Sequence, residues 1–297
     1  MSTSTSNTIV ITTTGCPAYV DGYDTSYNYV PSRAAGIAFV TLFSLATALH
    51  TIQFIWKRQW WCSVFAIGAL TEVIGWAGRL WSANCPYNKN AFLMQISTLI
   101  IAPTFFTAGI YIILGRMIKL VGPHTSPISP RTYLFIFCTC DVISLVVQAV
   151  GGGLASVASN SINGNTKPGT NAMVAGIVFQ MASITVFLYF FVTFCLRAQM
   201  STQPSKLKVL LVACCFSVTA IYIRSIYRTI ELAQGWSGYL ITHESYFIGL
   251  DGAMMIFAVT IFNVVHPGWF LSEPGAQHAM STKPQNGLQR EVGDMEK

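Results

Sequence analysis

Ten polar side chains stand inside stretches of sequence that are otherwise apolar, and they are the candidate binding residues. Ionisable groups are costly in hydrocarbon surroundings, so they pair with one another or mark the path of a polar ligand. Because both signs of charge occur, the set suits a zwitterionic or amine-bearing head group better than a simple anion or cation. The ten residues are Glu72, Arg79, Asp141, Gln148, Gln180, Arg224, Arg228, Glu231, Glu244 and Asp251.

Helical spacing arranges most of these residues in stripes. Residues at i, i+3, i+4 and i+7 share one face of a helix, and Glu72 and Arg79 are the ends of such a series. Most of the charges fall in the halves of their helices that we place nearer the outer surface, whereas Asp141 lies deeper. The pattern predicts a polar cavity that opens outward. The other stripes are Asp141, Ser144, Leu145, Gln148 and Gly152; Arg224, Arg228 and Glu231; and Glu244 with Asp251.

Two ion pairs are expected between the last two apolar stretches of the chain. Consecutive membrane helices are antiparallel, so Arg228 and Glu244 should lie at a similar depth, with Arg224 and Asp251 about two turns deeper. A buried charge without a partner is strongly unfavourable. We therefore predict the pairs Arg228–Glu244 and Arg224–Asp251. The alternative interpretation is that such pairs only fix the packing of the helices.

Composition identifies the elements that must position these residues. Only 9% of the 297 residues are charged, 53% are hydrophobic and the mean hydropathy is +0.52, whereas soluble domains carry about 25% charged residues. This excludes intrinsic disorder and argues against a soluble enzyme. The net charge of +6 is spread in short clusters between apolar runs and forms no phosphate-binding stripe. We expect a polytopic membrane protein without a nucleic-acid partner.

Seven apolar stretches are long enough to cross the bilayer as helices, which requires about 20 residues. The predicted fold is therefore an all-α bundle of seven transmembrane helices, residues 33–268. A Ser/Thr-rich segment, residues 1–32, precedes the bundle, and a tail predicted to be disordered, residues 269–297, follows it. The seven stretches are Ala34–Ile55, Trp61–Trp81, Ala91–Gly115, Thr132–Ala155, Asn171–Leu196, Leu207–Ile230 and His243–Val265.

The basic residues of the connections predict the orientation in the membrane. Eight Lys and Arg residues fall in the first, third and fifth connections, whereas the second and fourth contain only Lys89 and Lys167. Cytoplasmic loops carry the excess of Lys and Arg. We therefore expect the N-terminus outside and the C-terminus in the cytoplasm, with the first helix acting as its own insertion signal.

Cysteine and histidine usage gives one structural prediction and one exclusion. Cys16 and Cys85 both precede a proline and both fall on the predicted outer side, where disulfides persist. We predict that they form a disulfide, with two unpaired thiols as the alternative. A zinc site needs several His or Cys ligands at one depth. The five histidines are spread along the chain, so no metal or other cofactor is expected.

Several motifs together resemble one family of fungal membrane proteins. Residues 71–76 followed by Arg79 resemble the Glu–Gly–Tyr–Arg signature of RTA-like proteins, the lipid-translocating exporter family, with Trp76 in place of the usual Tyr. The resemblance runs in order from Pro31 to Gly268. Its other motifs are Ile101-Ala102-Pro103 with Ile110-Tyr111 and Gly115-Arg116; Asp141-Val142-Ile143-Ser144 with Gln148 and Gly151-Gly152; residues 224–231; and Glu244, Asp251 and His266-Pro267-Gly268.

The resemblance implies a seven-helix protein of the plasma membrane. Members of the family are linked to translocation of sphingoid long-chain bases, to resistance to toxic amphiphiles such as aminocholesterols, and to porphyrin or haem traffic. It also implies that the chain has no ATP-binding domain, and no G-x-x-x-x-G-K-[ST] motif occurs. The source of energy for any transport is left open.

Three functions fit these observations. The leading hypothesis is a transporter or translocator of lipids or amphiphiles, whose expected partners are the lipid bilayer and a membrane lipid or amphiphile as substrate; protein partners are left open. The second is a seven-helix receptor or lipid sensor. The third is an intramembrane zinc hydrolase, which would need about three converging histidines. We expect no enzymatic activity. The histidines are His50, His124, His243, His266 and His278.

Overall fold

The computed structural model of the chain describes residues 15–17, 19, 20, 23, 25–122, 125–159, 161, 164–198, 204–235 and 238–271. Within these ranges the chain is helical and contains no strand. The predicted tail lies almost wholly outside the described residues, as do His124 and His278. The elements are α1 (Arg33–Lys57), η1 (Trp60–Cys62), α2 (Ser63–Asn84), α3 (Lys89–Val121), α4 (Pro130–Ser159), α5 (Lys167–Arg197), α6 (Ser205–Ala233), α7 (Tyr239–Thr242), α8 (Glu244–Tyr246), η4 (Phe247–Ala253), α9 (Met254–Val264) and α10 (Pro267–Phe270).

Seven spans among the described residues are long and apolar enough to cross a membrane. The second combines η1 with α2, and the seventh runs through α8, η4, α9 and α10. The predicted all-α fold with seven spans is confirmed. Most helices are longer than their apolar stretches. For example, α3 has 33 residues, which at about 1.5 Å per residue exceeds a hydrocarbon core of about 30 Å.

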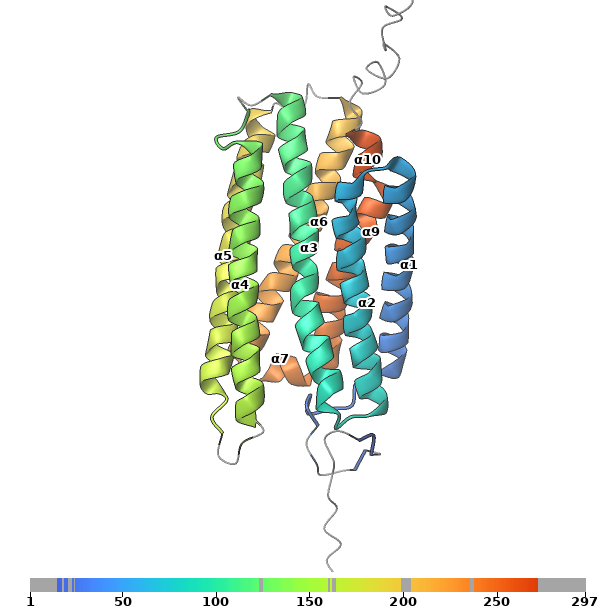
Figure 1. The fold of residues 1–297 in the computed structure, drawn as a ribbon, viewed down its shortest axis with the longest axis vertical. Helices are drawn as coiled ribbons and strands as arrows, with labels where there is room; N and C mark the ends of the chain where they lie inside the picture. The colour runs from blue at the N-terminus through green and yellow to red at the C-terminus, as the bar shows by residue number, and fades with distance from the viewer. Residues whose placement is uncertain are drawn as a thin grey trace, which may run out of the picture.

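The long helices lie side by side along the long axis of the molecule (Figure 1). We call the end at which α1, α3 and α5 begin the N-side end, and the opposite end the C-side end. The N-side end is the lower end in Figure 1, where the short helix α7 also lies. Because the number of spans is odd, Arg33 at the start of α1 and Phe270 at the end of α10 lie at opposite ends.

The outer surface of the bundle is apolar. Ile37, Leu45 and Ile52 on α1 are each more than half exposed, and so are Val146 and Val150 on α4. An apolar surface of this extent is typical of a protein that faces lipid. The polar side chains described below are instead turned into the bundle, where most of them contact polar groups of other helices.

Small residues and aromatic rings fill the interior. A Cβ atom added to Gly151 of α4 would lie 2.6 Å from the backbone nitrogen of Met173 and 2.7 Å from the carbonyl oxygen of Gly169 in α5. Such close backbone approach between membrane helices requires a small residue at the contact. Between α1 and α2, the rings of Phe39 and Trp76 stack with centroids 4.1 Å apart. These contacts hold the helices that carry the charged residues.

Candidate functional site

Seven of the ten predicted site residues lie towards the N-side end, and we call this group the charged cluster. They come from α2, α6 and the seventh span, which are distant in sequence. All are buried except Glu244, which is 18% exposed. The members of the charged cluster are Glu72, Arg79, Arg224, Arg228, Glu231, Glu244 and Asp251.

Asp251 is the centre of the cluster. Its Oδ1 atom lies 2.8 Å from Nε of Arg224 and 2.8 Å from Nε of Arg228. Arg228 also pairs through Nη1 with Glu231 at 2.8 Å, and Arg224 donates through Nη2 to the carbonyl oxygen of Leu99 in α3 at 2.6 Å. The predicted pair Arg224–Asp251 is confirmed. One carboxylate that holds two arginines ties α6 firmly to the seventh span.

The predicted pair Arg228–Glu244 is wrong. Glu244 pairs instead with Arg79 of α2, Nη2 to Oε1 at 2.9 Å, and accepts the backbone N–H of Ser32. The reason lies in η4, which is a π-helix. Its i→i+5 turns hold more residues than α-helical turns, so Glu244 and Asp251, seven residues apart, do not share a face. Asp251 faces α6, whereas Glu244 faces α2.

Arg79 lies in an aromatic surrounding that the sequence did not indicate. The hydroxyl of Tyr29 accepts from Nη2 at 2.6 Å, and the guanidinium lies 4.2 Å from the ring centroid of Phe247. Tyr27 hydrogen-bonds to Gln95 of α3, which also contacts Arg79. Burial raises the pKa of Tyr27 to about 12, so its hydroxyl keeps its proton. The only signal in the sequence was the cluster of tyrosines before the first helix.

A disulfide between Cys16 and Cys85 fixes the segment that carries these tyrosines. This bond was predicted and is confirmed. The same segment is held by Tyr87, whose hydroxyl bonds to both the N–H and the carbonyl of Val20. Tyr27 and Tyr29 therefore occupy the N-side face of the charged cluster, at the position where the sequence led us to expect an open cavity.

Glu72 differs from every other member of the cluster. Its side chain is fully buried, and neither carboxylate oxygen has a hydrogen-bond partner among the described residues. Arg224, Arg228 and Asp251 act on it electrostatically, and Trp76 is a polar neighbour on its own helix. The indole N–H of Trp76 forms no hydrogen bond of standard length and angle in the described part of the chain, and it is the donor on α2 that neighbours this carboxyl group.

Gln148 and Gln180 approach the cluster from α4 and α5. Gln148 donates to Ser144 at 2.6 Å and to Gln180 at 3.2 Å, and Gln180 donates to Thr104 of α3 at 3.4 Å. Both glutamines line a cavity of about 20 Å³ together with Arg224 and Arg228. That volume holds about one water molecule. This space, as described, is too small for a lipid head group.

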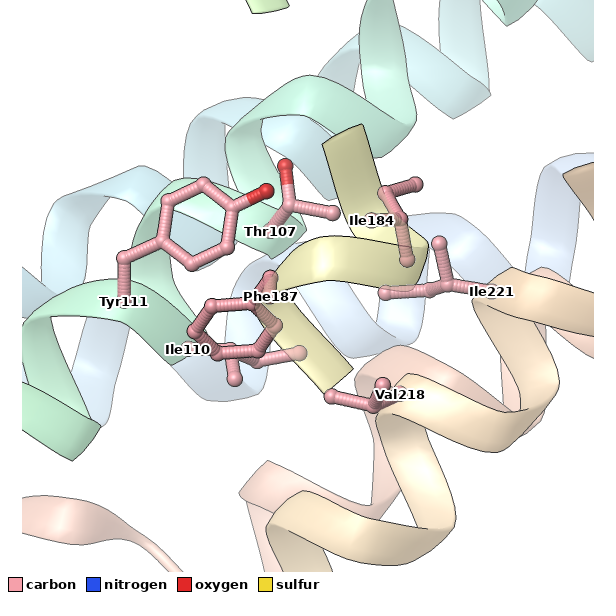
Figure 2. A pocket seen from close by; sticks show the side chains of 7 residues that line it. All are labelled: Thr107, Ile110, Tyr111, Ile184, Phe187, Val218 and Ile221. Atoms are coloured by element: carbon pink, nitrogen blue, oxygen red, sulfur yellow. The ribbon is translucent and has the colours of Figure 1, made fainter. Parts of the chain in front are cut away.

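Asp141 is the one predicted site residue that the fold keeps apart from the cluster. Its Oδ2 atom accepts hydrogen bonds from Thr107 at 3.0 Å and Tyr111 at 3.2 Å. Figure 2 shows the side chains of Thr107 and Tyr111 at a cavity of about 10 Å³ between α3, α5 and α6. The described residues place no Lys or Arg in an ion pair with Asp141.

Histidines do not assemble into a catalytic group in the described part of the chain. His50 contacts the carbonyl of Val259, and His266 accepts the N–H of Gly268. Among the described residues, no group of three or more His, Cys, Asp or Glu side chains could hold a metal ion. The geometry therefore offers nothing specific to the hydrolase alternative.

These features define a polytopic membrane protein with a buried, largely internally paired set of charges. The family model for RTA1 like protein matches residues 65–274. The chain belongs to this family, as the motifs indicated. No solved structure matches the chain.

Three relatives from Saccharomyces cerevisiae illustrate the range of the family. The chain is 32% identical to the sphingoid long-chain base transporter RSB1, over 91% of this chain and 80% of that protein. It is 28% identical to protoporphyrin uptake protein 1, over 80% and 90%, and 29% identical to protein RTA1, over 83% and 86%. Two of these names describe transport or uptake of a compound, so the receptor alternative is not favoured.

Proposed function

We propose that this protein transports amphiphilic lipids with an amine-bearing head group, of the sphingoid long-chain base type, across the membrane. The observation that carries the proposal is the buried charged cluster, with one unpartnered carboxyl group, in a chain 32% identical to a transporter of such bases. Transport of such compounds also gives the protein a role in resistance to toxic amphiphiles.

The cluster supplies what the head group of a sphingoid base requires. A primary ammonium needs a carboxylate and further acceptors once it leaves water, and Glu72 is a buried carboxyl group without a hydrogen-bond partner in the described part of the chain. Gln148 and Gln180 line the adjoining cavity and suit the hydroxyl groups of the base. The alkyl chain stays against the apolar outer faces of the helices. This division lets one protein accept tails of different length.

Access to the cluster requires movement in the N-side half of the bundle. The cavity beside Arg224 holds about 20 Å³, which is far below the 300–1,000 Å³ of common ligand pockets. Tyr27 and Tyr29 cover the N-side face, and the π-helical segment η4 carries Asp251. Since π-helical turns are frequent at functional sites, displacement of η4 or of the tyrosines is the step that admits the head group.

We place the protein in the plasma membrane with its N-terminus outside and its C-terminus in the cytoplasm. The excess of Lys and Arg in the odd-numbered connections supports this orientation. The disulfide Cys16–Cys85 lies on the same side as the N-terminal segment, and disulfides are typical of extracellular surfaces. The charged cluster would then lie in the outer half of the membrane.

The test is transport of a labelled sphingoid base by purified protein in liposomes. Protein-containing liposomes should release the base faster than protein-free liposomes of the same lipid composition. The matched control is the N-acetylated base, which keeps the tail and the hydroxyl groups but has no charge. We expect protein-dependent flux of the amine and none of the amide. Equal flux of both would contradict recognition of the head group, and no flux of either by folded protein would contradict transport.

A further inference from the structure

The charges of the cluster balance only when Glu72 is left out. Arg79 pairs with Glu244, while Arg224 and Arg228 share Asp251 and Glu231. Three arginines thus meet three carboxylates. Glu72 is the remaining acid, and it has no ion pair or hydrogen bond among the described residues although it is fully buried.

The groups facing Glu72 do not supply the missing partner. From α6, Arg224 and Arg228 act on it, but among the described residues neither forms an ion pair with Glu72, and Nε of each contacts Asp251, the facing charge from η4. On its own helix, the indole of Trp76 is a polar neighbour of Glu72, and Arg79, two turns away, pairs with Glu244. Of the buried titratable groups of α1 and α3, His50 stacks on Phe65, about two turns away from Glu72 along α2, and Tyr111 binds Asp141.

A buried carboxylate without a partner is less stable than the protonated acid in the same place, because the interior cannot solvate the charge. With a proton on Glu72 the cluster is electrically neutral. When that proton leaves, the cluster carries one negative charge in a buried place. A bound ammonium group restores neutrality as well as a proton does, and it donates the hydrogen bonds that the two carboxylate oxygens now lack.

We propose that Glu72 binds either a proton or the ammonium group of the lipid, and that exchange of one for the other couples transport to the proton gradient. In each exchange the O–H bond of the Glu72 carboxyl group breaks and its proton passes to water. The carboxylate then accepts a hydrogen bond from an N–H group of the ammonium. The net charge of the cluster with its bound cation is therefore the same before and after the exchange. This inference rests on the proposed function and identifies the proton gradient as the source of energy for transport.

Calorimetric titration of the purified protein with a water-soluble short-chain sphingoid base tests the exchange. The binding heat is measured in buffers of different ionisation enthalpy, and its dependence on the buffer gives the number of protons released. We expect about one proton per base bound for the unaltered protein and none for Glu72→Gln. Glu72→Asp, which keeps a carboxyl group, should restore the release.

The dependence of affinity on pH provides a second readout, and this measurement needs no variant of the protein. Between about pH 5 and 7, primary amines keep their charge. A proton that competes with the ammonium at one site therefore makes Kd fall about tenfold for each unit by which the pH rises. Binding without proton release and with a Kd independent of pH would overturn the exchange while leaving transport intact. Equal proton release by Glu72→Gln would overturn the assignment to Glu72. Absence of binding at every pH would instead contradict the proposed function itself.

Discussion

Asp251 and Asp141 are both fully buried carboxyl groups, but the fold treats them in opposite ways. Asp251 contacts two guanidinium groups at 2.8 Å each, whereas Asp141 accepts hydrogen bonds from the hydroxyls of Thr107 and Tyr111. The N-side half of the bundle is therefore ionic, and the surroundings of Asp141 are neutral and aromatic. Burial alone does not make an acidic residue part of a charged site; its partners do.

The largest difference in the free energy of unfolding should appear when each of the two aspartates is replaced by asparagine. Asp251→Asn leaves Arg224 and Arg228 buried beside a neutral group, and removal of one partner from a buried ion pair costs about 3–5 kcal/mol. Asp141→Asn keeps an acceptor for both hydroxyls and should cost about 1 kcal/mol. Unfolding in a detergent–denaturant series, followed by circular dichroism, measures both. Equal losses would contradict the contrast between the two halves.

Loss of the disulfide should have the next largest effect. Cys16→Ser with Cys85→Ser releases the segment that places Tyr27 and Tyr29 over the cluster, and removal of such a bond costs about 2–4 kcal/mol. Thermal unfolding of the double variant in detergent would show the loss. As a control, Cys140→Ser replaces a free cysteine of α4 and should leave the melting temperature nearly unchanged. An unchanged melting temperature in the double variant would show that the tyrosines are held without the disulfide.

Two tyrosine variants compare single hydroxyl groups in the two halves. Tyr29→Phe removes a hydrogen bond to the charged Arg79, worth about 1.5–3 kcal/mol, whereas a bond between neutral groups is worth about 0.5–1.5 kcal/mol. Tyr111→Phe, which removes a donor to Asp141, should fall in the lower range. Denaturant midpoints of the two variants give the order. A larger loss for Tyr111→Phe would mean that Asp141 is ionised and belongs with the charged residues.

Local patterns in the sequence were sufficient for much of this arrangement. Hydropathy located the seven spans, because each span satisfies its own backbone hydrogen bonds and depends little on its neighbours. The pair Arg224–Asp251 and the disulfide Cys16–Cys85 followed from depth and side of the membrane alone. Depth in the membrane and side of the membrane both follow from a residue's position along the chain, which can be read from the sequence.

The errors arose where geometry departs from regular helices. The pair Arg228–Glu244 failed because η4 is π-helical, and nothing in residues 247–253 distinguished it from an α-helix. Tyr27 and Tyr29 were missed because the segment before α1 has no periodicity that indicates which side chains enter the bundle. The deeper position of Asp141 was expected, but its partners Thr107 and Tyr111 were not, because they depend on how α4 packs against α3, which spacing along one helix does not determine.

The most direct measurement is transport by Glu72→Gln in liposomes, paired with its stability. Glu72 makes no hydrogen bond or ion pair among the described residues, so the amide, which is uncharged and close in size to the protonated acid, should leave the protein folded. Thr71→Val is the matched control, since it removes a neighbouring hydroxyl that bonds only to the carbonyl of Ile67 in its own helix. We predict that Glu72→Gln remains folded and loses flux of the sphingoid base, while Thr71→Val retains it. Normal flux through folded Glu72→Gln would contradict the account.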